Sequence, residues 1–313
     1  MSKKKKPQIE YRYYAPPPDS PVLSLLGDNW VRNYGDSKPI DRLHFHNHLE
    51  IGYCYWGRGI LNLNNTDFEF GEKTFSLIPR NFPHATSNVG YGLSSWEYLY
   101  IDADKFLKEF YLINPILAED MISRVNRKAH FCHAEDYPEI VVLIQQIFEI
   151  MRNKKDLYQE AVKGIILALL IQIARLNKSD KDTNNFPDII NTVISPALEH
   201  ISHHAAEQIK VNYLAEICHV SETHFRRIFS DCMGKTPVEY INWVRIKTAC
   251  DLLKQTDDSI NSIAVKISFS TVSTFNRNFR NLIGISPQEY RKAPEYYEQK
   301  LLNYNISTHQ GWL

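Results

Sequence analysis

An internal repeat near the C-terminus constrains the fold of this 313-residue chain more than any other feature. The segment Gly234–Tyr240 (GKTPVEY) recurs 50 residues later as Gly284–Tyr290 (GISPQEY). Upstream, the same offset pairs Phe225 with Phe275, Arg227 with Arg277 and Phe229 with Phe279. Self-similarity of this kind indicates one small structural unit built twice.

Each copy has the pattern of a helix-turn-helix. Its first helix is predicted from apolar residues at i, i+3, i+4 and i+7, which are Val211, Leu214, Ala215 and Cys218 in one copy and Ile260, Ile263, Ala264 and Ile267 in the other. The apolar faces of the second helices are Phe225, Phe229 and Cys232, and Phe275, Phe279 and Leu282. The expected N-caps are Ser221 in the first copy and Ser270 or Thr271 in the second.

The helix ends repeat as well. Gly234 and Gly284 are expected as left-handed C-caps. Thr236 and Ser286, each with a glutamate three residues later, predict capping boxes for a third helix. A helix with Trp243, Ile246, Cys250 and Leu253 on one face joins the two copies. A helical repeat that binds protein is the alternative, but two copies with outward arginines favour DNA.

Residues 189–292 resemble the DNA-binding domain of the AraC/XylS regulators. The resemblance is carried by Leu214-Ala215, Ser221, Phe225, Arg227, Phe229, Gly234, Pro237, Tyr240, Arg245, Ala249, Leu252-Leu253, Ile260, Ile263-Ala264, Phe269, Phe275, Arg277, Phe279, Gly284, Ser286-Pro287 and Tyr290-Arg291. The family usually has glycine where this chain has Ser268. If that residue is left-handed, serine there costs roughly 1 kcal/mol.

The resemblance implies that the exposed faces of the two second helices enter the major groove of double-stranded DNA. The residues concerned are Thr223, Arg226, Arg227, Val272, Ser273, Asn276 and Arg277. Arginine suits guanine and asparagine suits adenine, while valine and the threonine methyl group pack on thymine. Arg280 is expected on phosphate. Each of these side chains could instead be an ordinary solvated surface residue.

The N-terminal half reads as a small antiparallel barrel, because short apolar runs are broken by Asn-Asn, Gly and Pro. It resembles a cupin. His44-x-His46-x3-Glu50-x6-Gly57 matches the first cupin motif apart from its leading glycine, and Pro79-x-Asn81-x2-His84-x3-Asn88 matches the second with Asn81 in place of glycine. In metal-bearing cupins the positions of His44, His46, Glu50 and His84 hold the ion. Three imidazoles and a carboxylate suit Zn, Fe, Mn or Ni.

Cupin domains of this regulator family commonly bind an organic effector with no metal, so no cofactor is required. The candidate effector contacts are His46, Glu50, Trp56, His84 and Trp96. Strand parity places Trp56, rather than Tyr53 or Tyr55, on the face of the histidines. Aromatic faces beside polar groups favour a carbohydrate.

The expected fold is therefore an α+β two-domain chain. A cupin-like barrel over residues 20–110 precedes a helical segment over 111–176, a linker over 177–188 and the all-α domain over 189–292. Residues 1–19 and 293–313 are expected as mobile tails. Within the helical segment, residues 137–151 and 157–176 predict two helices, which in the family mediate homodimerisation. Packing onto their own barrel is the alternative, and both can hold.

Composition narrows the class of protein. Net charge is zero, so DNA contact needs a local patch, and the five cysteines form no CxxC pair. With no signal peptide or membrane span expected, the chain is placed in the cytoplasm. We therefore expect a non-enzymatic transcription regulator under small-molecule control, which contacts RNA polymerase if it is an activator. The alternatives are a metal-binding cupin enzyme and a DNA-binding regulator without an effector.

Overall fold

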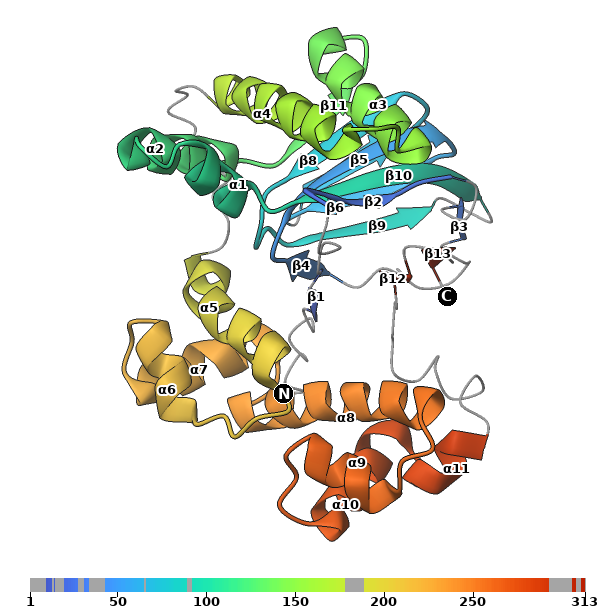
Figure 1. Ribbon diagram of the computed structural model, residues 1–313, viewed down its shortest axis with the longest axis vertical. Coiled ribbons are helices and arrows are strands. Elements are labelled where there is room, and N and C mark those ends of the chain that lie inside the picture. The colour runs from blue at the N-terminus through green and yellow to red at the C-terminus, as the bar shows by residue number, and fades with distance from the viewer. Residues whose placement is uncertain are drawn as a thin grey trace, which may run out of the picture. The chain divides into compact units, whose positions relative to one another are not determined.

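The computed structural model describes residues 10–12, 14, 20–27, 31–33, 43–64, 66–88, 92–177, 189–292, 306–307 and 311–312. The chain divides into two compact units, with the boundary between Thr192 and Val193. The N-terminal unit combines two sheets with helices, and the other unit is helical (Figure 1). This confirms the expected two-domain α+β architecture. No helix among the described residues is long and apolar enough to cross a membrane.

Two sheets form the N-terminal unit. The first has the strand order β1 (Glu10–Arg12), β4 (His44–His46), β9 (His84–Asn88), β6 (Gly59–Leu63), β7 (Thr66–Phe70). The second has the order β11 (His130–His133), β8 (Thr74–Ile78), β5 (Leu49–Trp56), β10 (Leu93–Ile101), β2 (Leu23–Leu25), and β3 (Val31–Asn33) also pairs with β10. Apolar residues from both sheets form one buried cluster that includes Leu61, Phe70, Cys54, Trp96 and Tyr100.

The opposite face of the second sheet is covered by helices (Figure 1). They are α1 (Ala103–Phe110), α2 (Pro115–Val125), α3 (Pro138–Asn153) and α4 (Tyr158–Leu176). Because side chains alternate along a strand, Cys54 packs inside the barrel while Tyr53 packs toward these helices. The apolar stripe Ile140, Ile144 and Ile147 of α3 joins the same core. The expected helices therefore do pack onto their own barrel.

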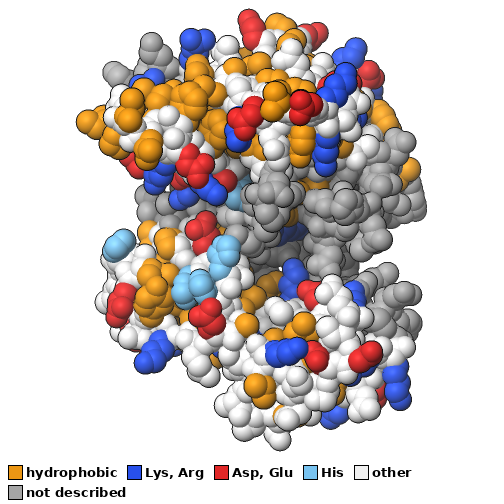
Figure 2. Space-filling model, viewed as in Figure 1, with side chains coloured by type: hydrophobic (Ala, Val, Ile, Leu, Met, Phe, Trp, Pro, Cys, Tyr) orange, Lys and Arg blue, Asp and Glu red, His pale blue; other side chains and the backbone are white. Residues whose placement is uncertain are grey.

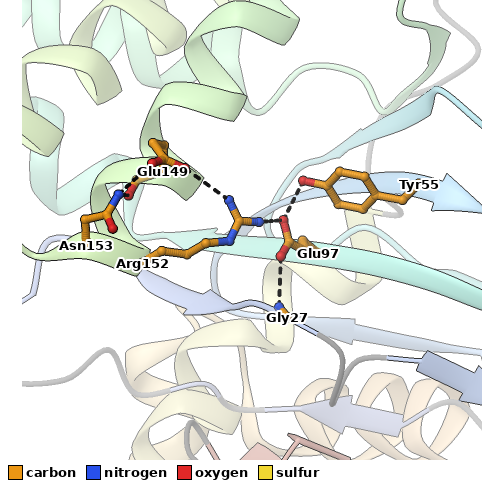
Figure 3. Close-up of polar contacts among 6 residues, drawn as sticks. All are labelled: Gly27, Tyr55, Glu97, Glu149, Arg152 and Asn153. Atoms are coloured by element: carbon orange, nitrogen blue, oxygen red, sulfur yellow. Dashed lines mark hydrogen bonds and ion pairs between the residues drawn. The ribbon is translucent and has the colours of Figure 1, made fainter.

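A buried carboxylate of β10 ties the end of α3 to the sheet. Glu97 of β10 is buried and accepts hydrogen bonds from the hydroxyl of Tyr55 at 2.5 Å and the amide of Gly27 at 2.8 Å. Arg152, in the last turn of α3, forms an ion pair with the same carboxylate (Figure 3). Three segments that are distant in sequence thus meet on one side chain.

The boundaries of the N-terminal unit differ from the predicted ones in two places. Strand β11 lies within the segment expected to be helical and adds to the second sheet beside β8. The expectation of a mobile tail is wrong for residues 10–12, which pair in parallel with β4, and for Tyr14, which is buried. Both errors arise from pairing between segments far apart in sequence, which local patterns do not report.

Seven helices form the described part of the C-terminal unit: α5 (Ile189–His204), α6 (Val211–Ile217), α7 (Glu222–Met233), α8 (Pro237–Gln255), α9 (Ile260–Lys266), α10 (Val272–Ile283) and α11 (Pro287–Lys292). Helix α8 joins two helix-turn-helix pairs, α6–α7 and α9–α10. The second pair packs its phenylalanines against Ile246, Cys250 and Leu253 of α8.

The remaining predicted segments are only partly described. Asn177 is the buried C-cap of α4, and residues 178–188 of the expected linker lie outside the described residues. In the expected C-terminal tail, β12 (Ile306–Ser307) pairs with β13 (Gly311–Trp312), and the other residues after Lys292 lie outside the described ones.

Candidate functional sites

The turn inside each helix-turn-helix has the same geometry. In the first unit the amide of Val220 donates to the carbonyl of Ala215 at 3.1 Å, and the equivalent bond in the second unit measures 3.0 Å. The preceding residue is left-handed in both, with φ of 56° at His219 and 57° at Ser268. Ser268 is therefore left-handed, which is the condition under which serine is costly there, and the first unit also has a non-glycine residue, His219, at the same place.

The caps fix where the recognition helices α7 and α10 begin and end. Ser221 caps α7, and Thr271, rather than Ser270, caps α10, with its side chain accepting from the amide of Thr274 at 3.1 Å. Both helices end at left-handed glycines, Gly234 and Gly284.

The phenylalanines of α7 and α10 lie in the core of each helix-turn-helix unit. Phe225, Phe229, Phe275 and Phe279 are all fully buried. Cys232 and Leu282 were expected in the same stripes, but Met233 and Ile283, one residue further along, are buried instead. In both helices, therefore, the residue beside the capping glycine faces the core.

The structure places the predicted DNA contacts on the opposite, solvent-facing side. Thr223, Arg226, Arg227, Ser273, Asn276, Arg277 and Arg280 are exposed, and Val272 is half-buried. Arg226 forms an ion pair with Glu222 one turn earlier, at 2.7 Å. Arg227 lies 3.1 Å from the Nδ1 atom of His224 and has no carboxylate partner among the described residues. Its guanidinium is therefore the more available of the two for a base edge.

The barrel brings together the four predicted metal ligands. His44, His46, Glu50 and His84 are all buried, and one ligand atom from each lies within 4.8 Å of the others. His44 pairs with His84 across β4 and β9, while Glu50 enters from β5 of the other sheet. The Oε2 atom of Glu50 lies 3.0 Å from Nε2 of His46 and 3.5 Å from Nε2 of His84.

Backbone carbonyls fix the tautomers of two of these histidines. Nδ1 of His46 donates to the carbonyl of His48, and Nδ1 of His84 donates to the carbonyl of Phe82, each at 2.9 Å. A carbonyl oxygen only accepts, so both Nδ1 atoms carry hydrogen and both Nε2 atoms point toward Glu50. Metal-binding histidines are usually oriented by this kind of hydrogen bond.

Burial and mutual contact shift the pKa values of Glu50 and His46. Burial raises the pKa of Glu50, but the interaction with His84 and the hydrogen bonds from His46 and His84 outweigh it and hold that pKa well below 4.5. Burial, however, lowers the pKa of His46 from 6.5, so the charged imidazolium is itself disfavoured. A cation among the Nε2 atoms would give the carboxylate its positive partner while the imidazoles stay neutral.

Asn81 supports this arrangement from the loop before β9. It stands where the cupin motif has glycine, and it is left-handed with φ of 60°. Its amide donates to the carbonyl of His46 at 2.7 Å. Asparagine tolerates this conformation better than most residues do, so the departure from the motif preserves the local backbone.

The two tryptophans predicted to contact an effector, Trp96 and Trp56, differ in burial. Trp96 is buried in the barrel interior, and its Nε1–H has no hydrogen-bond partner among the described residues. Trp56, the last residue of β5, is 45% exposed, whereas the four residues of the histidine cluster are buried.

Sequence reasoning missed Tyr14, which packs beside the histidines and Tyr100. The ring centroid of Tyr14 lies 5.5 Å from that of His46 and 4.3 Å from that of Tyr100. The amide of Tyr14 donates to Oδ1 of Asn47 at 3.0 Å, and Nδ2 of Asn47 donates back at 3.1 Å. The signal available in the sequence was the tyrosine-rich segment around residues 11–14, which is unusual for a solvated tail.

Two family models match the chain in the order of its two units. An AraC-like ligand binding domain matches residues 40–170, and a helix-turn-helix domain matches residues 214–293. Together they span both candidate sites, the histidine cluster and the paired recognition helices.

Individual relatives give the same picture. An uncharacterised HTH-type transcriptional regulator of Haemophilus influenzae is 23% identical over 261 residues, which cover 78% of this chain and 85% of the relative. An HTH-type transcriptional regulator of Mycobacterium tuberculosis is 38% identical over 84 residues, covering 27% of this chain and 32% of that protein. The lactose operon transcription activator of Staphylococcus xylosus is 25% identical over 165 residues, covering 52% and 58%. The chain therefore spans about a third to just over half of the latter two relatives.

Proposed function

Because this chain belongs to the AraC family of transcription regulators, we propose that it binds a specific DNA sequence through both helix-turn-helix units and that a ligand in the barrel controls this binding. The observation that supports this proposal is that two recognition helices, with the same turn hydrogen bond and the same kinds of cap, present polar and cationic side chains to solvent.

The exposed residues suit base reading in the major groove. Arg227 and Arg277 occupy the same place in the two units, and each can form a bidentate pair with guanine. Asn276 matches the donor and acceptor pattern of adenine, and Arg280, at the far end of α10, suits a phosphate. The residues 189–292 carry 12 Lys and Arg against 10 Asp and Glu, so binding needs both units rather than bulk charge.

The test is selection of a binding sequence from random DNA by the full-length protein. Arg227→Ala combined with Arg277→Ala should abolish selection of a motif, whereas Arg175→Ala, an exposed arginine on α4 of the other unit, should leave it unchanged. If the wild-type protein selects no motif at low salt, with or without candidate ligands, the DNA-reading proposal fails.

For the effector, we propose a carbohydrate held by His46, Glu50, His84 and Trp96. The buried, unpartnered Nε1–H of Trp96 and the acceptor atoms of Glu50 match the mixed donors and acceptors of sugar hydroxyls. The lactose operon relative is consistent with this class of ligand. Trp56 contributes only if the ligand extends to the end of β5.

A panel of mono- and disaccharides in thermal unfolding experiments tests the effector. A sugar bound at 100 times its Kd should stabilise the native protein by about 2.7 kcal/mol. Trp96→Phe should weaken that sugar selectively because it removes the hydrogen-bond donor and keeps an aromatic ring. A protein that selects DNA but responds to no ligand is the effector-free regulator.

A second function is favoured by the fixed tautomers of His46 and His84. We propose that His44, His46, Glu50 and His84 hold a divalent metal ion, Zn, Fe, Mn or Ni. Elemental analysis of protein purified without chelators should then find about one metal per barrel, and His84→Gln combined with Glu50→Gln should lose it. Turnover of a small substrate by the loaded protein would favour the cupin enzyme alternative, and metal without turnover would leave the regulator.

For assembly, we propose a homodimer that uses the end of α1 and the start of α2. This region exposes Leu112, Ile113 and Ile116 at 80, 98 and 84% (Figure 2). Exposed apolar clusters of this kind mark interaction sites. Ile113→Glu combined with Ile116→Glu should shift sedimentation from dimer to monomer, whereas Val265→Glu, on the exposed side of α9, should not. If the protein is an activator, RNA polymerase is the further partner.

A further inference from the structure

A histidine pair lies on α5, outside both sites described above. His200 and His204 are one helical turn apart, and their ring centroids are 4.4 Å apart with an angle of 22° between the ring planes. Both rings are only partly buried. Figure 2 shows histidine side chains grouped on the surface of the helical unit.

An acidic side chain orients one of these rings. Oε1 of Glu207 lies 2.8 Å from Nδ1 of His204. An ionised carboxylate only accepts hydrogen bonds, so Nδ1 of His204 carries the hydrogen and its Nε2 presents a lone pair. A carboxylate behind a histidine is the usual device that orients a metal-binding imidazole and raises its basicity.

The second ring is suited to the same role. His200 lies one turn before His204 on the same face of α5, so its imidazole can offer a second nitrogen to the same ion. For a tetrahedral ion with Zn–N bonds of about 2.0–2.1 Å, two ligand nitrogens lie roughly 3.4 Å apart. The 4.4 Å separation of the two ring centroids is compatible with this spacing.

We propose that His200 and His204 form a binding site for one divalent transition-metal ion of the Zn²⁺ or Ni²⁺ class, with Glu207 orienting His204 and water completing the coordination. Imidazole nitrogen is a favoured ligand for these ions. The site is separate from the barrel cluster and goes beyond the proposed function.

The position of the pair links it to the DNA-reading units. The loop after α5 is held by Arg245 of α8, which donates to the carbonyls of Ala205 at 2.8 Å and Glu207 at 2.7 Å. The hydroxyl of Ser268, in the turn of the second helix-turn-helix, donates to the carbonyl of Ala206 at 2.5 Å. Metal binding would therefore stiffen a loop that α8 and the second unit both contact.

Equilibrium dialysis of the full-length protein against micromolar Zn²⁺ tests the proposal. His200→Gln and His204→Gln should each lower the bound Zn²⁺ by one equivalent relative to the wild type. The matched control is His203→Gln, because His203 is an exposed neighbour whose ring lies 6.3 Å from that of His204, and it should keep the wild-type stoichiometry. Glu207→Gln should retain the site with roughly tenfold weaker affinity.

The difference in bound Zn²⁺ between the wild type and the histidine variants is the same whether or not the barrel binds metal. If the barrel also binds metal, the wild type holds two equivalents and the His204→Gln variant one; if it does not, the values are one and zero. Circular dichroism should show that the surface variants remain folded. Equal Zn²⁺ stoichiometry in the wild type, His200→Gln and His204→Gln would overturn the proposal, and so would an equal loss in His203→Gln.

Discussion

Phe225 and Phe229 of the first helix-turn-helix occupy the same positions as Phe275 and Phe279 of the second, and all four are fully buried. The ring centroids within the two pairs are 5.4 and 5.7 Å apart. The interiors, turns and capping glycines of the two units thus follow one plan.

The exposed faces do not follow that plan. Position 222 holds glutamate, which pairs with Arg226, whereas the equivalent positions of the second unit hold Val272 and Asn276. Only Arg227 and Arg277 match. The difference indicates that the interior maintains a shared frame while each solvent face can read its own DNA bases, so changes inside should affect stability equally and changes outside should affect recognition unequally.

The largest expected effect is on stability. Phe225→Ala and Phe275→Ala should each destabilise the helical unit by about 3–5 kcal/mol, because each removes a fully buried ring from a small core. Urea unfolding of the full chain, followed by circular dichroism, would measure both. Val265→Ala, at an exposed position on α9, is the control and should change little. A large loss in only one of the two Phe variants would show that the cores are not equivalent.

On DNA, Arg227→Ala and Arg277→Ala should each cost about 1–3 kcal/mol of binding and relax selectivity at different base pairs of the operator. Arg226→Ala should cost less, because Arg226 must give up its ion pair with Glu222 before it contacts DNA. Fluorescence anisotropy with the selected site and its single-base variants measures these losses. Relaxation at the same base pair in both variants would contradict two independently reading units.

The left-handed turn residues should respond by smaller and unequal amounts. His219→Gly should stabilise the protein by about 1 kcal/mol, because glycine adopts a positive φ without strain. Ser268→Gly gains the same relief but loses the hydrogen bond to Ala206, worth about 1 kcal/mol, so its net effect should be near zero. Thermal unfolding of the two variants provides the comparison, and equal stabilisation would mean that the Ser268 bond contributes nothing.

The smallest effect concerns the capping boxes of α8 and α11. Hydrogen bonds from Thr236 lower the pKa of Glu239 from 4.5, and hydrogen bonds from Ser286 lower that of Glu289. A carboxyl whose pKa is lower in the folded state stabilises the protein above the unfolded pKa, and that stabilisation is lost as pH falls through the folded pKa. Glu239→Gln and Glu289→Gln should therefore be slightly destabilising at pH 6 and indistinguishable from the wild type at pH 3. If the variants remain less stable than the wild type at pH 3, the loss of stability comes from packing rather than from the charge of the carboxylate.

Local signals in the sequence were sufficient where the structure is local. The capping residues and the exposed faces of α7 and α10 all follow from patterns shorter than 20 residues. The buried cluster of His44, His46, Glu50 and His84 could also be predicted, because two short motifs place these residues on strands that meet.

Nonlocal pairing was beyond the reach of these patterns. The parallel pairing of β1 with β4 places Tyr14 over His46, yet no short motif in the N-terminal segment predicts it. The same holds for β11, which is four residues long and joins β8 across more than 50 residues of chain. Strand parity could not show that Trp56, at the last position of β5, is 45% exposed.

The Glu97 carboxylate has a consequence for how the N-terminal unit assembles. It is buried, and its partners come from the segment after β2, from β5 and from the last turn of α3 (Figure 3). A partly assembled barrel that lacks any of these segments would bury the charge with too few partners, and an unpaired buried charge costs about 3–5 kcal/mol. Partial folds are thereby penalised, so sheet and helices should unfold in a single cooperative transition, and a fragment ending before residue 152 should not hold the barrel together.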